Sequence, residues 1–161
     1  YLGATYVPME AAGYVLFDEL FYRRKDQFAE LLAQKNSLSV RILGRLSAVD
    51  PEHCLAQLVS PFSGEKSPCL LTDLRMLSED DRCQIYQYGN SKSMSESAVS
   101  QESRLVQFLG DLTVASEEAK RLKLTAHSYL LMDGVEFDLY KSVVSLTRPY
   151  LKNLPSLSVT P

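Results

Sequence analysis

The side chains best suited to metal binding or nucleophilic chemistry are few in this sequence and stand far apart. It contains two histidines and three cysteines, which are His53, His127, Cys54, Cys69 and Cys83. A structural metal site needs about four clustered nitrogen or sulfur ligands, and no C-x-x-C pair is present to supply part of one. We therefore expect no metal, no cofactor and three reduced thiols.

Motifs typical of enzymes are also missing. The sequence has no G-x-S-x-G, no P-loop, no G-x-G-x-x-G and no H-E-x-x-H, the patterns that place a nucleophile, a phosphate or a zinc ion. His127 falls on the outward phase of a strand pattern, with no nucleophile beside it in the sequence. We expect a protein that is not an enzyme.

The charge and the lengths of the apolar runs limit the classes of partner. The net charge of −3 argues against a protein that holds nucleic acid alone, because neutralising phosphates calls for a strongly basic face. The apolar runs are a handful of residues long, far below the ~20 that a membrane span needs. We expect no membrane partner, and any role on nucleic acid to be shared with another protein.

The widest apolar surface lies on a predicted final helix at residues 136–151, which "NLP" ends. At about 100° per residue, one direction along this helix holds Phe137, Tyr140, Val144 and Leu151. A second direction holds Leu139, Val143, Leu146 and Tyr150. Together they form an arc wider than the ~100° stripe that one contact surface requires. One group can lie on the domain itself, and the other needs a cover, either a partner protein or the N-terminal helix of the same chain.

Alternating apolar and polar residues predict five strands before that helix. The patterns start at residue 38, at about 54–60 and 67–74, at residue 105 and at 121–132. Residues 1–14 read as irregular, and residues 15–34 as a helix in two pieces, because "YRRKDQ" interrupts its apolar stripe. Residues 78–103, whose last fourteen include six serines, read as a flexible insertion. The predicted organisation is therefore an N-terminal extension over 1–37, one domain over 38–151 and a tail over 152–161.

Two of the predicted strands carry the same glycine motif, "VRILGRL" from Val40 and "VQFLGDL" from Val106. Gly44 and Gly110 occupy the inward phase of their strands. Five strands followed by a helix predict a small closed antiparallel barrel, and such a barrel bends its longest strands sharply. A glycine there removes a side chain where backbones crowd and permits a bulge.

The order "VRILGRL", "LVQFLGDL" and "LKLTAHSYLLMDGVEFDLYKSVV" resembles the smallest subunits of replication protein A and of the CST telomere complex. The opening "GATYVPME" is similar to the CST branch in particular. The resemblance implies an OB-fold, a five-stranded antiparallel Greek-key barrel with a C-terminal α-helix. The extra segment at 14–35 and the serine-rich insertion depart from the pattern.

The resemblance also implies a function and partners. In these families the C-terminal helix pairs with a helix of a larger OB-fold subunit, forming a heterodimer within a heterotrimer. It further implies a place in the nucleus at chromosome ends, with single-stranded DNA and DNA polymerase α–primase as partners of the assembled complex. The predicted partner interface is therefore Phe137, Leu139, Tyr140, Val143, Val144, Leu146 and Tyr150.

Direct contact with nucleic acid is expected to be weak. OB-folds bind single strands near the loops that join strands 1–2 and 4–5, and here those loops, "DPEH" and "ASEEAKR", carry acidic residues that repel phosphates. The residues left to offer charge or a stacking ring are Arg41, Arg45, Arg121, Lys123 and Tyr129. Two alternatives stay open, the smallest subunit of replication protein A and an OB-fold interaction module without a nucleic-acid role.

Overall fold

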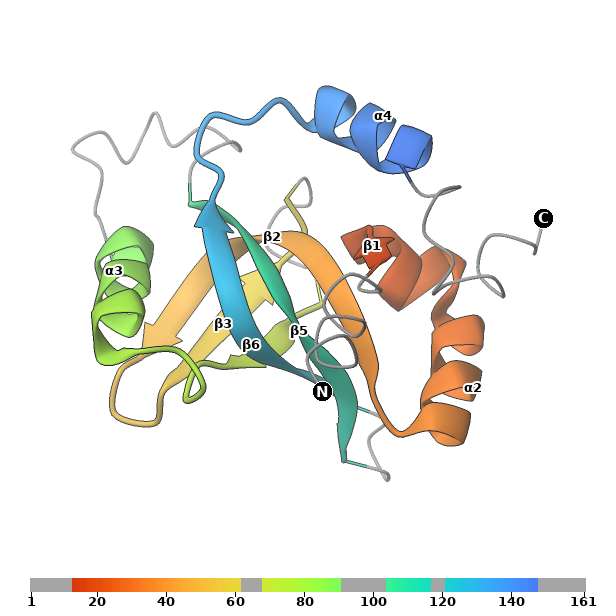
Figure 1. Ribbon diagram of the computed structural model, residues 1–161, viewed down its shortest axis with the longest axis horizontal. Helices are drawn as coiled ribbons and strands as arrows, with labels where there is room; N and C mark the ends of the chain where they lie inside the picture. The colour runs from red at the N-terminus through yellow and green to blue at the C-terminus, as the bar shows by residue number, and fades with distance from the viewer. Residues whose placement is uncertain (1–12, 62–67, 91–103, 117–120, 148–161) are drawn as a thin grey trace, which may run out of the picture.

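A computed structural model of the protein describes residues 13–61, 68–90, 104–116 and 121–147. Five strands form the barrel (Figure 1). They are β2 (Leu38–Asp50), β3 (Leu55–Val59), β4 (Leu70–Asp73), β5 (Leu105–Ser116) and β6 (Arg121–Leu131). Their order is β2-β3-β4-β6-β5, and pairing of β2 with β5 closes the ring. This is the Greek-key order of an OB-fold, so the predicted fold is confirmed.

The expectation that all the strands run antiparallel is wrong. β4 and β6 pair in parallel, with Thr72 opposite Leu124. A sixth strand, β1 (Gly13–Val15), pairs in parallel with the first half of β2. The barrel is therefore mixed, because a closed ring with an odd number of strands cannot be antiparallel at every pairing.

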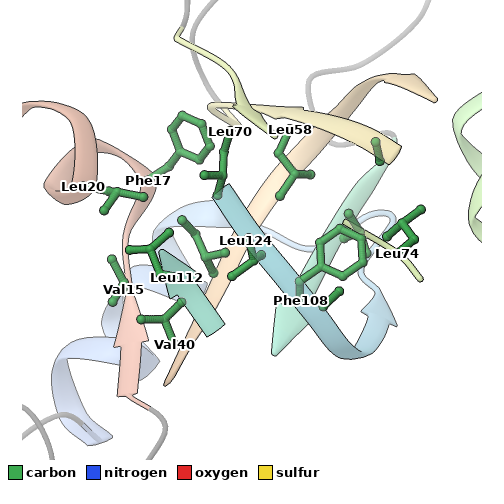
Figure 2. Packing of buried hydrophobic residues seen from close by; sticks show 14 of the residues in the cluster. Val15, Phe17, Leu20, Val40, Leu58, Leu70, Leu74, Phe108, Leu112 and Leu124 are labelled. Atoms are coloured by element: carbon green, nitrogen blue, oxygen red, sulfur yellow. The ribbon is translucent and has the colours of Figure 1, made fainter. Parts of the chain in front are cut away.

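The N-terminal segment contributes to the same hydrophobic core as the barrel. After β1 come a π-helical turn, η1 (Glu19–Arg23), and the helix α2 (Lys25–Lys35), so the two-piece helix is confirmed. Gly13–Val15 is a strand, where the sequence pattern predicted irregular or helical structure. Figure 2 shows Val15, Phe17 and Leu20 directed into one interior with side chains of the barrel strands. Burying these three apolar residues ties the extension to the domain.

Residues 79–90 form a helix, α3 (Glu79–Asn90), where a flexible insertion was expected. Ser78 Oγ accepts a hydrogen bond from the backbone N–H of Asp81 at 3.1 Å, and three acidic residues occupy the first turn. This is a favourable helix N-terminus. Ile85 is fully buried in the core, and α3 and α2 lie on opposite sides of the barrel (Figure 1). The serine-rich stretch at 91–103 lies outside the described residues.

A bulge shifts the inward phase of β2. Ser47 is the extra residue in β2, between the pairs Leu46–Leu58 and Ala48–Gln57. An added residue moves every later side chain to the opposite face. Ala48, expected inside, is therefore exposed, and Val49 packs against the core instead.

The two inward glycines stand where backbones approach closely. A Cβ on Gly110 would lie 2.2 Å from the carbonyl oxygen of Thr125, and one on Gly44 would lie 3.1 Å from that of Val59. The register of β5 against β6 shifts at Leu109/Gly110. The predicted reason for the repeated glycine is confirmed, because both positions leave little or no room for a side chain.

The last helix, α4 (Phe137–Thr147), lies across the outside of the barrel (Figure 1). Among the described residues, no helix combines the length and the apolar character needed to cross a bilayer.

Candidate partner-docking helix

The helix α4 begins after a tight turn at the end of β6. Gly134 has φ +83°, a conformation that favours glycine, and the N–H of Val135 donates to the carbonyl of Met132 at 3.0 Å. Asp138 lies in the first turn of α4, where a negative charge is favoured by the helix dipole. The turn therefore releases the chain from the barrel and starts the helix within a few residues.

One face of α4 rests on the barrel through a second hydrophobic cluster, separate from the core. Tyr140 and Val144 are buried there. Their partners on the barrel side are Leu16, Leu43 and Leu105, with Tyr14, Met132, Val135 and Phe137 packed around them. The hydroxyl of Tyr140 donates a hydrogen bond to Gln107 Oε1 on β5 at 2.7 Å. We call this set of contacts the α4 seat.

The second apolar face of α4 is exposed. Leu139 is 60% exposed, Val143 46% and Leu146 71%. Within the described part of the chain, neither η1 nor α2 covers these side chains, which is the alternative that the sequence left open. Three large apolar residues close together on one helix face are typical of a contact surface for another protein. We call these three residues the exposed α4 face.

The predicted interface therefore divides into two parts. Tyr140 and Val144 were assigned to a partner, whereas in this structure the chain's own residues bury them. Phe137 is half-buried at the same seat. Tyr150 lies outside the described residues. Leu139, Val143 and Leu146 are the predicted interface residues that the described structure leaves accessible.

Sequence reasoning missed the residues that support α4 from below. Leu43 is apolar on the outward phase of β2, which breaks the alternation of "VRILGRL", and it is 2% exposed beneath α4. That irregularity, together with the apolar Leu105 on the outward phase of β5, is the signal that marks the covered outer surface. Tyr14 and Gln107 give no comparable signal, since a lone tyrosine or glutamine suits any surface.

The basic residues proposed for nucleic acid are not brought together. On β2, Arg41 stands opposite Leu109 of β5, whereas Lys123 stands opposite Thr113, four positions further along the same strand. The guanidinium of Arg41 lies 5.4 Å from the ring centroid of Tyr14, an attractive cation–π geometry. Arg45 on β2 stands opposite Leu105 and Arg121 on β6 stands opposite Ser116, at the two ends of β5. The basic residues therefore form two separate groups, Arg41 with Arg45 on β2 and Arg121 with Lys123 on β6, rather than one basic track.

Lys123 is engaged with a buried carboxylate. Its Nζ lies 3.3 Å from Asp73 Oδ2, and Arg75 donates to both oxygens of Asp73. Hydrogen bonds from Arg75, and then from Lys123, lower the pKa of Asp73 to about 2 despite its burial. The positive charge of Lys123 therefore faces an internal carboxylate and is less available to a phosphate.

Tyr129 points inward, which corrects its predicted place on the outer face. The pairs Leu109–Ser128 and Gly110–Ala126 leave His127 as an extra residue in β6, and this bulge reverses the phase beyond it. Tyr129 packs against the core, and its hydroxyl contacts Gln84 of α3. It is not placed to stack on a nucleic-acid base.

A serine, an aspartate and a histidine do meet on the outer face of the sheet. Asp111 accepts a hydrogen bond from Ser39 Oγ at 3.0 Å, and its other oxygen lies 2.8 Å from His127 Nε2. In a catalytic triad the imidazole contacts both the hydroxyl and the carboxylate, whereas here the carboxylate stands between the other two. The trio therefore links three strands and does not activate the serine. Among the described residues, no group of three potential metal ligands was found.

Comparison with known proteins assigns the chain to a family. Residues 9–154 of the 161 match the model of a family described as a telomere-capping CST complex subunit. The chain belongs to this family of CST subunits. The family is non-catalytic and corresponds to one of the two branches that the sequence resembles. Telomere capping places such a subunit at chromosome ends in the nucleus. No curated protein matches the sequence of this CST subunit.

Three solved structures are similar to this CST subunit. A chain of the S. pombe Stn1–Ten1 complex shares 11% identity with a TM-score of 0.49, covering 86% of this chain and 92% of that one. The telomere capping protein Ten1 from S. pombe shares 11% identity with a TM-score of 0.49, covering 86% and 98%. Replication protein A of U. maydis bound to single-stranded DNA shares 12% identity with a TM-score of 0.46, covering 86% and 91%.

Proposed function

We propose that this CST subunit docks on a larger OB-fold subunit of its complex through the exposed α4 face. The observation that carries the proposal is the exposure of Leu139, Val143 and Leu146 on a helix whose opposite face is anchored to the barrel. Covering three such side chains is worth on the order of 4 kcal/mol, a large share of the stability of a typical domain. A partner protein bound to the exposed α4 face would remove these three side chains from water.

We infer a partner that presents a helix of its own. An exposed face of residues spaced three and four apart pairs well with another amphipathic helix. Membership of a family of complex subunits supports the existence of such a partner. The solved S. pombe complex joins Ten1 to Stn1, and we propose a Stn1-like subunit as the partner of this chain, within a heterotrimer.

The proposed role on DNA is indirect. The net charge is −3, the arginines named above form two groups, and Lys123 faces Asp73. These features favour single-stranded DNA binding mainly through the assembled complex, with this chain stabilising the larger subunit. We also propose that the complex supports telomere replication with DNA polymerase α–primase, an inference supported by family likeness alone.

Co-expression with the Stn1-like subunit tests the docking surface. The double variant Leu139→Asp/Val143→Asp places two charges in the proposed interface, so we expect co-purification to be lost while the barrel stays folded by far-UV circular dichroism. The matched control is Lys141→Gln/Ser145→Asp, which changes the net charge by the same two units at exposed polar positions away from the exposed α4 face. It should retain the partner. Survival of the complex with the first variant would refute α4 as the docking helix.

A further inference from the structure

The N-terminal strand β1 brings an aromatic residue under the docking helix. β1 pairs with β2 so that Tyr14 stands opposite Arg41. Its neighbour Val15 belongs to the core, whereas Tyr14 and Leu16 belong to the α4 seat. Figure 1 shows β1 at the side of the barrel, below α4 in this view. The N-terminal segment, which departs from the pattern of the resembled families, thus supplies part of the surface on which α4 rests.

A continuous series of rings and cations runs from β2 through β1 into α4. Arg41 Nη1 donates to the Tyr14 hydroxyl at 3.4 Å, and its guanidinium lies against the Tyr14 ring. The rings of Tyr14 and Tyr140 meet edge to face, with centroids 6.5 Å apart and planes at 79°. Tyr140 in turn stacks on Phe137 at 6.4 Å, and Lys141 Nζ lies 5.5 Å from the Phe137 ring centroid.

Edge-to-face and cation–π contacts depend on direction as well as on distance. A purely aliphatic seat resists separation of two surfaces but tolerates rotation of a helix about its own axis. The ring of Tyr14 meets α4 at one defined angle through Tyr140, while Gln107 holds the Tyr140 hydroxyl at one point. A rotation of α4 breaks both contacts and swings Leu139 and Val143 away from their outward direction.

We propose that Tyr14 is a positioning residue for partner docking. Through its contact with Tyr140 it holds α4 in the orientation that presents the exposed α4 face, and it does not itself contact the partner. This inference rests on the proposed function, because it concerns the same exposed α4 face. It gives the N-terminal extension a role in assembly beyond completing the core. The ring of Tyr14 carries the effect, since the ring makes the edge-to-face contact with Tyr140, whereas the hydroxyl accepts a hydrogen bond from Arg41.

The test uses the full chain with three tyrosine variants. In Tyr14→Leu the side chain stays apolar but the ring is lost, and we expect affinity for the Stn1-like subunit to fall by about tenfold. Tyr14→Phe keeps the ring, so binding should return to within about threefold of the original. Tyr22→Leu is the matched control, because Tyr22 is 62% exposed on η1 and is not part of the seat.

Hydrogen exchange of α4 in the free chain separates positioning from general destabilisation. Tyr14→Leu should speed the exchange of α4 amides while leaving those of β2 and β5 unchanged, because local opening follows local contacts. Unchanged affinity of Tyr14→Leu, beside loss of binding by Leu139→Asp, would overturn the positioning role alone. Retained binding by Leu139→Asp would instead refute the docking surface itself, and the positioning role with it.

Discussion

The hydroxyl of Tyr140 on α4 donates a hydrogen bond to Gln107 Oε1 on β5, at 2.7 Å. This bond joins residues 33 positions apart in sequence and connects the proposed docking helix to the first part of the barrel strand β5. Leu43 on β2 stands opposite Gln107 and is buried under the same helix. The position of α4 is therefore set by the hydrogen bond between Tyr140 and Gln107 together with the apolar contacts of the α4 seat.

Removing that hydroxyl should loosen the helix without unfolding the barrel. We expect Tyr140→Phe to lower the free energy of unfolding by about 1 kcal/mol, the usual contribution of one partly buried hydrogen bond. Urea denaturation followed by circular dichroism measures the change. Tyr22→Phe, at an exposed position, should show none, and an equal loss in both variants would contradict the structural role of the Tyr140–Gln107 bond.

Gly110→Ala should lower the free energy of unfolding much more than Gly44→Ala does. The added Cβ would overlap the carbonyl oxygen of Thr125 in one case and only press on that of Val59 in the other. Overpacking of this kind costs about 1–3 kcal/mol, so Gly110→Ala should lie at or above that range and Gly44→Ala at its lower end. Chemical denaturation of the two variants gives the ranking, and the reverse order would contradict the proposed bend at Gly110.

The carboxylate of Asp73 should make stability depend on pH in the acid range. Its pKa is about 2 in the folded chain against an ordinary value of 3.8, so the fold favours the charged form. The resulting stabilisation, about 2 kcal/mol, is complete above the ordinary pKa and is lost as the pH falls from about 4 toward 2.

Asp73→Asn removes this dependence and tests it. Unfolding free energies measured from pH 7 down to pH 2 should show the variant less stable at neutral pH, with the difference shrinking as the original carboxylate becomes protonated. Glu30→Gln, at an exposed position of α2, serves as the control. A difference that stays constant over the whole pH range would show that Asp73 acts by packing rather than by charge.

The helix α3 should behave as part of the folded domain. Ile85 is fully buried, so Ile85→Ala is expected to cost about 2–4 kcal/mol of unfolding free energy. Gln87→Ala changes an exposed residue of the same helix and should be nearly neutral. If the two variants were equally stable, residues 79–90 would be the loose insertion that the sequence suggested.

The isolated chain should bind single-stranded DNA weakly. The basic side chains stand in separate groups and Lys123 is engaged by Asp73, so we expect micromolar or weaker dissociation constants at physiological salt, near the ~10⁻⁴–10⁻⁶ M of non-specific binding. Fluorescence anisotropy with a labelled oligonucleotide measures this. A nanomolar dissociation constant for the chain alone would contradict the indirect role.

The barrel strands and the last helix were predictable from the sequence because their signals are local. Alternation along β2 and β5 places Val40 and Phe108 inside, and the repeated glycine already indicated a bend. The width of the apolar arc on residues 137–147 indicated two contact faces. Family likeness added the strand order, which alternation alone does not specify.

Tertiary structure decided the features that depend on pairing. The bulge at His127 arises from the register between two strands, and it turned Tyr129 from an outward residue into an inward one. The polar segment at residues 79–90 is a helix because it packs on the core, and Ile85 is the one fully buried side chain among its described residues. The barrel contacts only one face of α4. Tyr140 lies on that face and is buried in the α4 seat, whereas Leu139 lies on the other face and is exposed.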